Sequence, residues 1–342
     1  MNMLIGQTRW RWLALILSLI LSLQLFSSCA KERTGALAYV SNERDGTVTV
    51  IDIGTDRVLT TIQVGARPRG IRLSPDHQRV YVAVSYPYQQ GQSEAKGNVN
   101  KIVAIEVASG KVVATYDAGD DPENFVVSLD GTRFYIANED AGAASVVDLN
   151  ANRLLAALVV GAEPEGVALS PDGRWVYVTS ESTSTVSVID TQTNEAVKTF
   201  LVDARPREAI FSPDGMLAYV SAENGGTVSV VETKTHTVVD TIQLPRGEVK
   251  PKGIVISGDG QRLYVATGRG NSVAVIDAAS RKLLNMIPVG KRPWGIALTP
   301  DGKKLYAANG LSNDVSVIDI ATNQVVTIIR AGDGPWGIAI KP

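Results

Sequence analysis

A four-residue signature that begins with tyrosine recurs seven times along this chain. It reads YVSN, YVAV, YIAN, YVTS, YVSA, YVAT and YAAN, and begins at Tyr39, Tyr81, Tyr135, Tyr177, Tyr219, Tyr264 and Tyr306. Successive tyrosines lie 42, 54, 42, 42, 45 and 42 residues apart. A period in this range is typical of repeat architectures, in which each repeat is one supersecondary unit. The repeat therefore constrains the fold strongly, and the places where repeats differ become the candidates for function.

Each repeat is expected to form four short antiparallel strands. Residues 164–202 contain four runs rich in Val, Ile and Tyr, separated by turn sequences such as PDG. No window has the 3.6-residue apolar period of a helix. Seven such units predict an all-β fold, a seven-bladed β-propeller over residues 37–342. The chain enters at a second strand and ends after a first strand, so we expect the C-terminal strand to pair with the N-terminal blade and close the ring.

The N-terminus differs from the rest of the chain. Arg9 and Arg11 precede an apolar run at residues 13–26, followed by Ser27, Ser28 and Cys29. This order predicts a signal peptide over residues 1–28, with an uncleaved membrane anchor as the alternative. The sequence LFSSC resembles a bacterial lipobox, so we expect Cys29 to be lipidated and residues 29–36 to form a short tether. Cleavage by an ordinary signal peptidase remains open.

These features predict a protein of the bacterial cell envelope, held on the periplasmic side by a lipid anchor. Cys29 is the only cysteine, so no intrachain disulfide can form. Loss of residues 1–28 removes two arginines and no acid, which leaves a mildly acidic domain. Nucleic-acid binding needs a basic surface and is not expected. We expect a monomer.

A proline motif of the type P-x-G precedes each first strand and predicts a ring of side chains at the mouth of the channel. The residues that follow the prolines are Arg69, Glu123, Glu165, Arg207, Lys252, Trp294 and Trp336. The preceding positions add Arg67, Asp121, Glu163, Arg205, Lys250 and Arg292. This charged opening is a candidate binding surface for a small polar ligand or an envelope protein. A solvated rim of weak ion pairs is the alternative.

Two irregularities fall on the same face. Trp294 and Trp336 stand where other repeats place charged residues, and they can stack a ligand, anchor a partner, or pack on each other. The 54-residue step marks about twelve extra residues near residues 86–100, where Tyr86 and Tyr88 suit a binding loop. A tolerated surface insertion is the alternative.

The repeats resemble those of YVTN-type β-propellers of microbial envelope proteins. Segments such as PEGVALSPDG, YIANED and GPWGIAIKP are most similar to the β-propeller proteins associated with PQQ-dependent catabolism, over about nine-tenths of the chain. The resemblance implies the propeller fold and an association with a periplasmic quinoprotein system, since that family is not defined by a reaction.

Three functions are open from the sequence. The main expectation is a non-enzymatic binding or scaffold protein that requires no cofactor. The chain has no C-x-x-C-H haem motif, no Gly-rich phosphate loop and no Ser-His-Asp candidate on the mouth face. A second possibility is a lactonase-like hydrolase with Ca²⁺ held by Asp121, Asn138, Glu139 and Glu181. A third is direct binding of a flat anionic cofactor such as PQQ between the tryptophans, over Arg67, Arg69 and Arg292.

Overall fold

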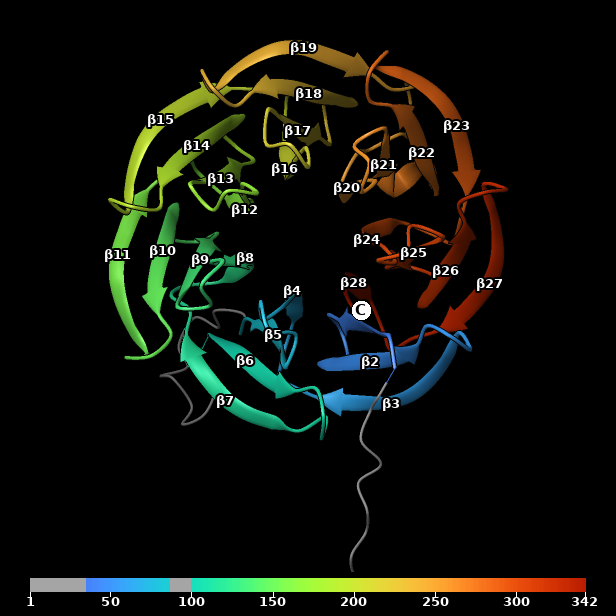
Figure 1. Ribbon diagram of the computed structural model, residues 1–342, viewed down its shortest axis with the longest axis horizontal. Coiled ribbons are helices and arrows are strands. Elements are labelled where there is room, and N and C mark those ends of the chain that lie inside the picture. Colours follow the sequence, from blue (N-terminus) through green and yellow to red (C-terminus); the bar gives the residue numbers. More distant parts are fainter. Residues whose placement is uncertain (1–34, 87–99) are drawn as a thin grey trace, which may run out of the picture. The chain divides into compact units, whose positions relative to one another are not determined.

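The computed structural model describes residues 35–86 and 100–342, and these form seven four-stranded antiparallel sheets. Figure 1 shows the sheets arranged as blades around a central axis, with one strand of each blade innermost and one outermost. The predicted seven-bladed propeller is confirmed. The signal peptide, the lipidation of Cys29, most of the tether and Tyr88 lie outside the described residues and stay predictions. None of the helical structure in the described part has the length and hydropathy of a membrane span.

The blades are numbered from the N-terminus, and their strands are given from the axis outward. Blade 1 consists of β28 (Pro335–Lys341), β1 (Leu37–Asn42), β2 (Thr47–Asp52) and β3 (Arg57–Gln63). Blade 2 consists of β4 (Pro68–Leu73), β5 (Arg79–Val84), β6 (Lys101–Glu106) and β7 (Val112–Asp117). Blade 3 consists of β8 (Pro122–Val127), β9 (Arg133–Asn138), β10 (Ala143–Asp148) and β11 (Arg153–Val159). Blade 4 consists of β12 (Pro164–Leu169), β13 (Trp175–Ser180), β14 (Thr185–Asp190) and β15 (Glu195–Leu201).

The remaining blades continue in the same order. Blade 5 consists of β16 (Pro206–Phe211), β17 (Leu217–Ala222), β18 (Thr227–Glu232) and β19 (Thr237–Gln243). Blade 6 consists of β20 (Ile254–Ile256), β21 (Arg262–Ala266), β22 (Ser272–Asp277) and β23 (Lys282–Pro288). Blade 7 consists of β24 (Pro293–Leu298), β25 (Lys304–Asn309), β26 (Asp314–Asp319) and β27 (Gln324–Arg330). The 3₁₀ turn η1 (Gly268–Gly270) joins β21 to β22.

The predicted closure of the ring is confirmed in blade 1. The C-terminal strand β28 pairs antiparallel with β1, and Tyr39 lies opposite Ala339 in the register. Strand β1 pairs with β2 on its other side, so blade 1 is built from both ends of the propeller sequence. The pairing satisfies backbone groups of β1 that an open ring would leave at a sheet edge.

The signature tyrosines lie in the hydrophobic layers between adjacent blades. Tyr39 packs with Val80 and Val103 of the next blade, and Tyr264 packs with Ile296 and Leu305. All seven tyrosines are nearly or completely buried. The repeated aromatic residue therefore fills the interface that a single blade cannot cover alone, which explains its periodicity.

Three of these tyrosines also bond to the turn between the third and fourth strands of the next blade. The Tyr135 hydroxyl donates to Asn194 at 3.1 Å, and the Tyr306 hydroxyl donates to Asp56. The Tyr177 hydroxyl lies 2.7 Å from Nδ1 of His236. The turn residues Asp56, Asn194 and His236 all have positive φ angles. His236 therefore takes part in contacts between blades and lies far from the chemistry considered below.

Candidate functional site

The proline motifs place one polar or aromatic side chain of each blade in the channel. In six blades the residue before the proline has a positive φ angle, which turns the chain sharply into the first strand. The six are Arg67, Asp121, Glu163, Arg205, Arg292 and Gly334. The residue after the proline then lies next to the axis, and this holds for Glu165, Arg207, Lys252, Trp294 and Trp336. The structure thus brings together side chains up to 171 positions apart.

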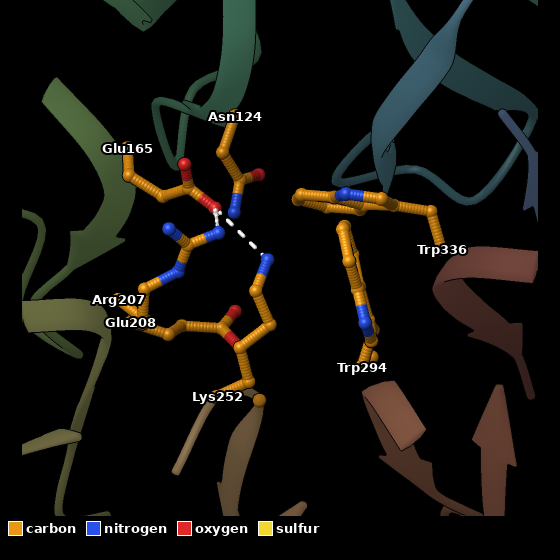
Figure 2. Close-up of a pocket in the computed structure, with 9 residues that line it drawn as sticks. Asn124, Glu165, Arg207, Glu208, Lys252, Trp294 and Trp336 are labelled. Carbon is orange, nitrogen blue, oxygen red and sulfur yellow. Dashed lines mark hydrogen bonds and ion pairs between the residues drawn. The ribbon is translucent and has the colours of Figure 1, made fainter. Parts of the chain in front are cut away.

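These five side chains, with Asn124, Glu208, Gly253 and Gly295, line what we call the central cavity, whose volume is about 20 Å³. Figure 2 shows Asn124, Glu165 and Arg207 on one side and the tryptophans on the other, with the Lys252 amine between them. A wider opening of about 220 Å³ shares Glu165, Arg207 and both tryptophans with it. That opening also includes Arg69, Glu123 and Arg292. The mouth residues predicted from the sequence therefore gather around one continuous space.

Burial excludes the solvated-rim interpretation for the innermost charges. Glu123, Glu165, Arg207 and Lys252 are all less than 9% exposed. Charges that are withdrawn from water require close partners. Arg207 lies 2.5 Å from Glu165 and also pairs with Glu181, while Lys252 Nζ lies 3.1 Å from Glu165 Oε1.

Lys252 has an unusual environment for a lysine. Its Nζ lies 3.6 Å from the ring centroid of Trp294 and 5.1 Å from that of Trp336. Burial, with Arg207 as the next cause, lowers the pKa of Lys252 to about 7, and Glu165 opposes the shift. Burial alone would raise the pKa of Glu165, but the cations Arg207, Lys252 and Arg69 hold it down to about 2. Near neutral pH the cavity therefore contains a carboxylate beside an amine that can gain or lose a proton.

The two tryptophans contact each other as well as Lys252. Their ring centroids are 6.0 Å apart, and their planes are inclined by 69° in an edge-to-face arrangement. A flat ligand such as PQQ would have to separate the rings in order to stack between them. Arg292 lies over Trp294 at 5.2 Å, whereas Arg67 pairs with Asp121 and Glu43 at the rim. Binding of PQQ stays a prediction that this geometry does not favour.

The residues expected to bind Ca²⁺ do not come together as one set. Carboxylate oxygens of Asp121, Glu123 and Glu139 lie within 4.8 Å of one another. Arg67 pairs with Asp121 at 3.5 Å, while Arg69 pairs with Glu123 and, at 3.6 Å, with Glu139. A divalent cation would compete with these arginines.

The other two expected Ca²⁺ ligands are engaged elsewhere. Glu181 pairs with Arg205 and Arg207. The side-chain amide of Asn138 donates to the carbonyl oxygen of Ala118. The donor set therefore does not fit the predicted metal site.

Tyr86 packs between two blades and does not line the central cavity or the wider opening. Its ring packs against the hydrophobic layer between blades 1 and 2, and Lys101 Nζ lies 5.9 Å from the ring centroid. Its backbone N–H donates to Asn100. Tyr86 lines none of the cavities described above, so its role as a binding residue stays a prediction without support from its position.

Two residues of the central cavity were not predicted from the sequence. Asn124 and Glu208 occupy the third position of the motif, where the other five blades have glycine. Glu208 also pairs with Arg72 at 3.4 Å, from a blade across the channel. The signal was available in the sequence as PEN and PRE among motifs that otherwise read P-x-G.

The comparisons with known proteins add an enzymatic indication. Residues 202–327 match the family model described as lactonase, 7-bladed β-propeller, and residues 105–209 match that of the cytochrome D1 haem domain. No curated protein matches the chain. Neither match spans half of the chain, and neither represents the YVTN or PQQ-associated families. The association with PQQ-dependent catabolism therefore stays a prediction.

Solved structures agree on the fold. The periplasmic gluconolactonase of Pseudomonas aeruginosa superposes with a TM-score of 0.75 at 20% identity, over 90% of this chain and 99% of that one. The hydrazine synthase of Kuenenia stuttgartiensis gives a TM-score of 0.72 at 22% identity, over 83% and 92%. At these identities the likeness establishes the seven-bladed fold alone, because one fold supports many functions.

The lactonase match corrects two expectations from the sequence, namely that the protein is a binding scaffold and that it is not an enzyme. The main interpretation as a non-enzymatic scaffold is wrong, because the match favours the hydrolase that was the alternative. The absence of a catalytic triad, a haem motif and a phosphate loop from the sequence does not exclude catalysis by a buried lysine. A buried lysine acquires its reactivity only from its surroundings.

The haem-domain match does not extend to a haem site. The matched residues 105–209 contain no histidine, cysteine or methionine, which are common ligands of haem iron. His77 is exposed on a turn and His236 bonds to Tyr177. The cavity residues do not fit this cofactor.

Proposed function

We propose that the protein is a lactonase-like hydrolase that opens a cyclic ester where the central cavity joins the wider opening. The observation that carries the proposal is the buried Lys252, whose Nζ lies 3.1 Å from the Glu165 carboxylate inside a cavity. The match of residues 202–327 to the lactonase model supports it.

In the proposed reaction Lys252 acts as the general base. Its neutral amine takes a proton from a water molecule while the water oxygen adds to the ester carbonyl carbon. The ammonium that forms is stabilised by the Glu165 carboxylate and by the face of Trp294, so the interactions of Lys252 strengthen as it gains the proton.

Ring opening returns the same proton. The tetrahedral intermediate collapses, the bond between the carbonyl carbon and the ring oxygen breaks, and the departing oxygen takes the proton from Lys252 Nζ. The product is an open-chain hydroxy acid, and Lys252 is neutral again. Glu165 acts as a positioning residue because it holds the amine and does not itself exchange the proton.

Hydrolysis of a panel of γ- and δ-lactones, followed by acid release, tests the proposal. The Lys252→Met variant is expected to lose at least about 100-fold in kcat/KM, because general-base catalysis contributes roughly 10²–10⁴-fold. The control is Lys303→Met, since the Lys303 side chain is 81% exposed on a turn. Failure of the folded wild-type protein to hydrolyse any lactone, or full activity of Lys252→Met, would contradict the proposal.

A further inference from the structure

The third position of the proline motif forms a ring of close contacts around the axis. It is glycine in five blades, at Gly70, Gly166, Gly253, Gly295 and Gly337. A Cβ atom at Gly166 would lie 2.3 Å from the carbonyl oxygen of Arg207, and one at Gly253 would lie 2.3 Å from that of Trp294. The backbone of the next blade therefore excludes side chains at these positions.

Asn124 and Glu208 are the two exceptions, and both side chains enter the central cavity. Asn124 has a polar amide side chain, but the residue is only 3% exposed. Gly70 leaves space for it, because a Cβ atom there would lie 2.8 Å from Asn124 Oδ1. A buried polar side chain at a position that is otherwise glycine needs an explanation beyond packing.

The orientation of the Asn124 amide is fixed by the backbone. The N–H of Phe125 donates to Asn124 Oδ1 at 2.9 Å, which leaves Nδ2 as the free end of the amide. Within residues 35–86 and 100–342, Nδ2 donates no hydrogen bond to another residue. Figure 2 shows this nitrogen directed into the cavity, on the side where Glu165 and Arg207 meet.

An amide N–H donor held in a fixed orientation can stabilise an oxygen atom that gains negative charge. Attack on an ester carbonyl transfers charge to the carbonyl oxygen, and a donor that is already oriented stabilises it without reorganisation. Asn124 Nδ2 and Lys252 Nζ face the same space. An ester carbonyl bound there would present its oxygen to Asn124 Nδ2. Its carbon would face a water molecule beside Lys252 Nζ.

We propose that Asn124 is the oxyanion-binding residue of this site and donates from Nδ2 to the carbonyl oxygen of the cyclic ester. The inference rests on the proposed lactone hydrolysis and adds a residue to it. Asn124 makes its bond in the bound ester and strengthens it as the tetrahedral intermediate forms.

Two variants test the role. Asn124→Gly restores the residue that five other blades carry, and Asn124→Asp keeps the shape but removes the donor. Both are expected to lower kcat by about 10²–10³-fold, the usual effect of losing one oxyanion donor, with a smaller change in KM. Asn124→Gly should keep the melting temperature close to that of the wild type, whereas Asn124→Asp should lower it because it buries a carboxylate in the cavity that holds Glu165. The matched control is Asn285→Ala. Asn285 accepts the same local bond from the next backbone N–H but lies exposed on β23.

The outcomes separate this inference from the proposed function. If wild-type protein hydrolyses lactones and both variants retain kcat within about threefold, the role of Asn124 is overturned and the lactonase proposal stands. If wild-type protein hydrolyses none, that proposal fails, and binding of δ-valerolactam then decides on Asn124.

The lactam presents the same carbonyl group and resists hydrolysis. The Asn124 side-chain amide signals are identified in a ¹⁵N correlation spectrum by their absence from Asn124→Asp. A shift of these signals on addition of lactam supports the contact. Unchanged signals overturn it, whatever the activity of the protein.

Discussion

Lys252 lies among groups that act on its proton in opposite directions. Burial and Arg207 favour the neutral amine, whereas Glu165 and the tryptophan faces favour the ammonium. The balance brings the pKa of Lys252 to about 7, where a general base is most effective. A lysine on the surface would remain charged and could not take up a proton at this pH.

This balance predicts the pH dependence of the reaction. We expect kcat/KM to rise with pH up to about 7 and then to level off, because Lys252 must be neutral to accept a proton. In Glu165→Gln the rise should occur at lower pH, since the carboxylate raises the pKa of Lys252 and its loss lowers that pKa. Stopped-flow acid-release measurements across pH 5–9 would show both midpoints. A midpoint that moves upward in Glu165→Gln would contradict the role assigned to this pair.

At the scale of the element, the turns between third and fourth strands connect neighbouring blades. Asn194 and His236 occupy equivalent turn positions and bond to Tyr135 and Tyr177 of the preceding blade. Burial, followed by the charge of Lys198, lowers the pKa of His236. The imidazole is therefore neutral in the folded protein at pH values where it is partly protonated in the unfolded chain.

The His236→Asn variant should make the stability of the propeller less sensitive to acid. Below pH 6.5 the unfolded wild-type chain binds a proton at His236 that the folded protein binds only at lower pH, so wild-type stability falls as pH decreases. Asparagine can make the bond that Asn194 makes and does not titrate. Urea unfolding at pH 7.5 and 5.5 should show a smaller stability loss in the variant than in the wild type. An equal loss in both proteins would remove His236 as the cause.

At the scale of the whole molecule, the ring depends on the pairing of β28 with β1. The innermost strand of blade 1 is the last strand of the chain, and it carries Trp336 into the central cavity. The strand that closes the ring therefore also completes the candidate site. A chain that lacks this strand loses both.

Deletion of residues 335–342 should open the propeller. It would leave β1 as an unpaired edge and uncover the apolar layers on both sides of blade 1. We expect aggregation and loss of a single cooperative thermal transition, measured by light scattering and calorimetry. Removal of Pro342 alone is the control, because it lies beyond β28. A monodisperse monomer with a sharp transition after the longer deletion would show that closure is not required.

The repeat and the proline motif were sufficient to predict most of the architecture. The tyrosine period predicted the number of blades, and the positions of the first and last strands predicted the closure. The motif also indicated Glu165, Arg207, Lys252, Trp294 and Trp336 as neighbours around the channel. The motif did not indicate Asn124 and Glu208, because they depart from the glycine that the other five blades carry. The binding role of Tyr86, which was inferred from the insertion, stays a prediction, and its ring packs against the layer between blades 1 and 2.

The scaffold follows from the sequence pattern alone, because the apolar and turn residues that form each blade recur within every repeat. The proposed chemistry depends on contacts that form only in the folded protein. The reactivity of Lys252 comes from burial and from residues of other blades, namely Arg207, Glu165 and Trp294. The free donor of Asn124 depends on the space that Gly70 leaves in the preceding blade. The pKa of Lys252 and the unbonded donor of Asn124 depend on distances between segments that are far apart in the sequence. A sequence pattern does not contain these distances.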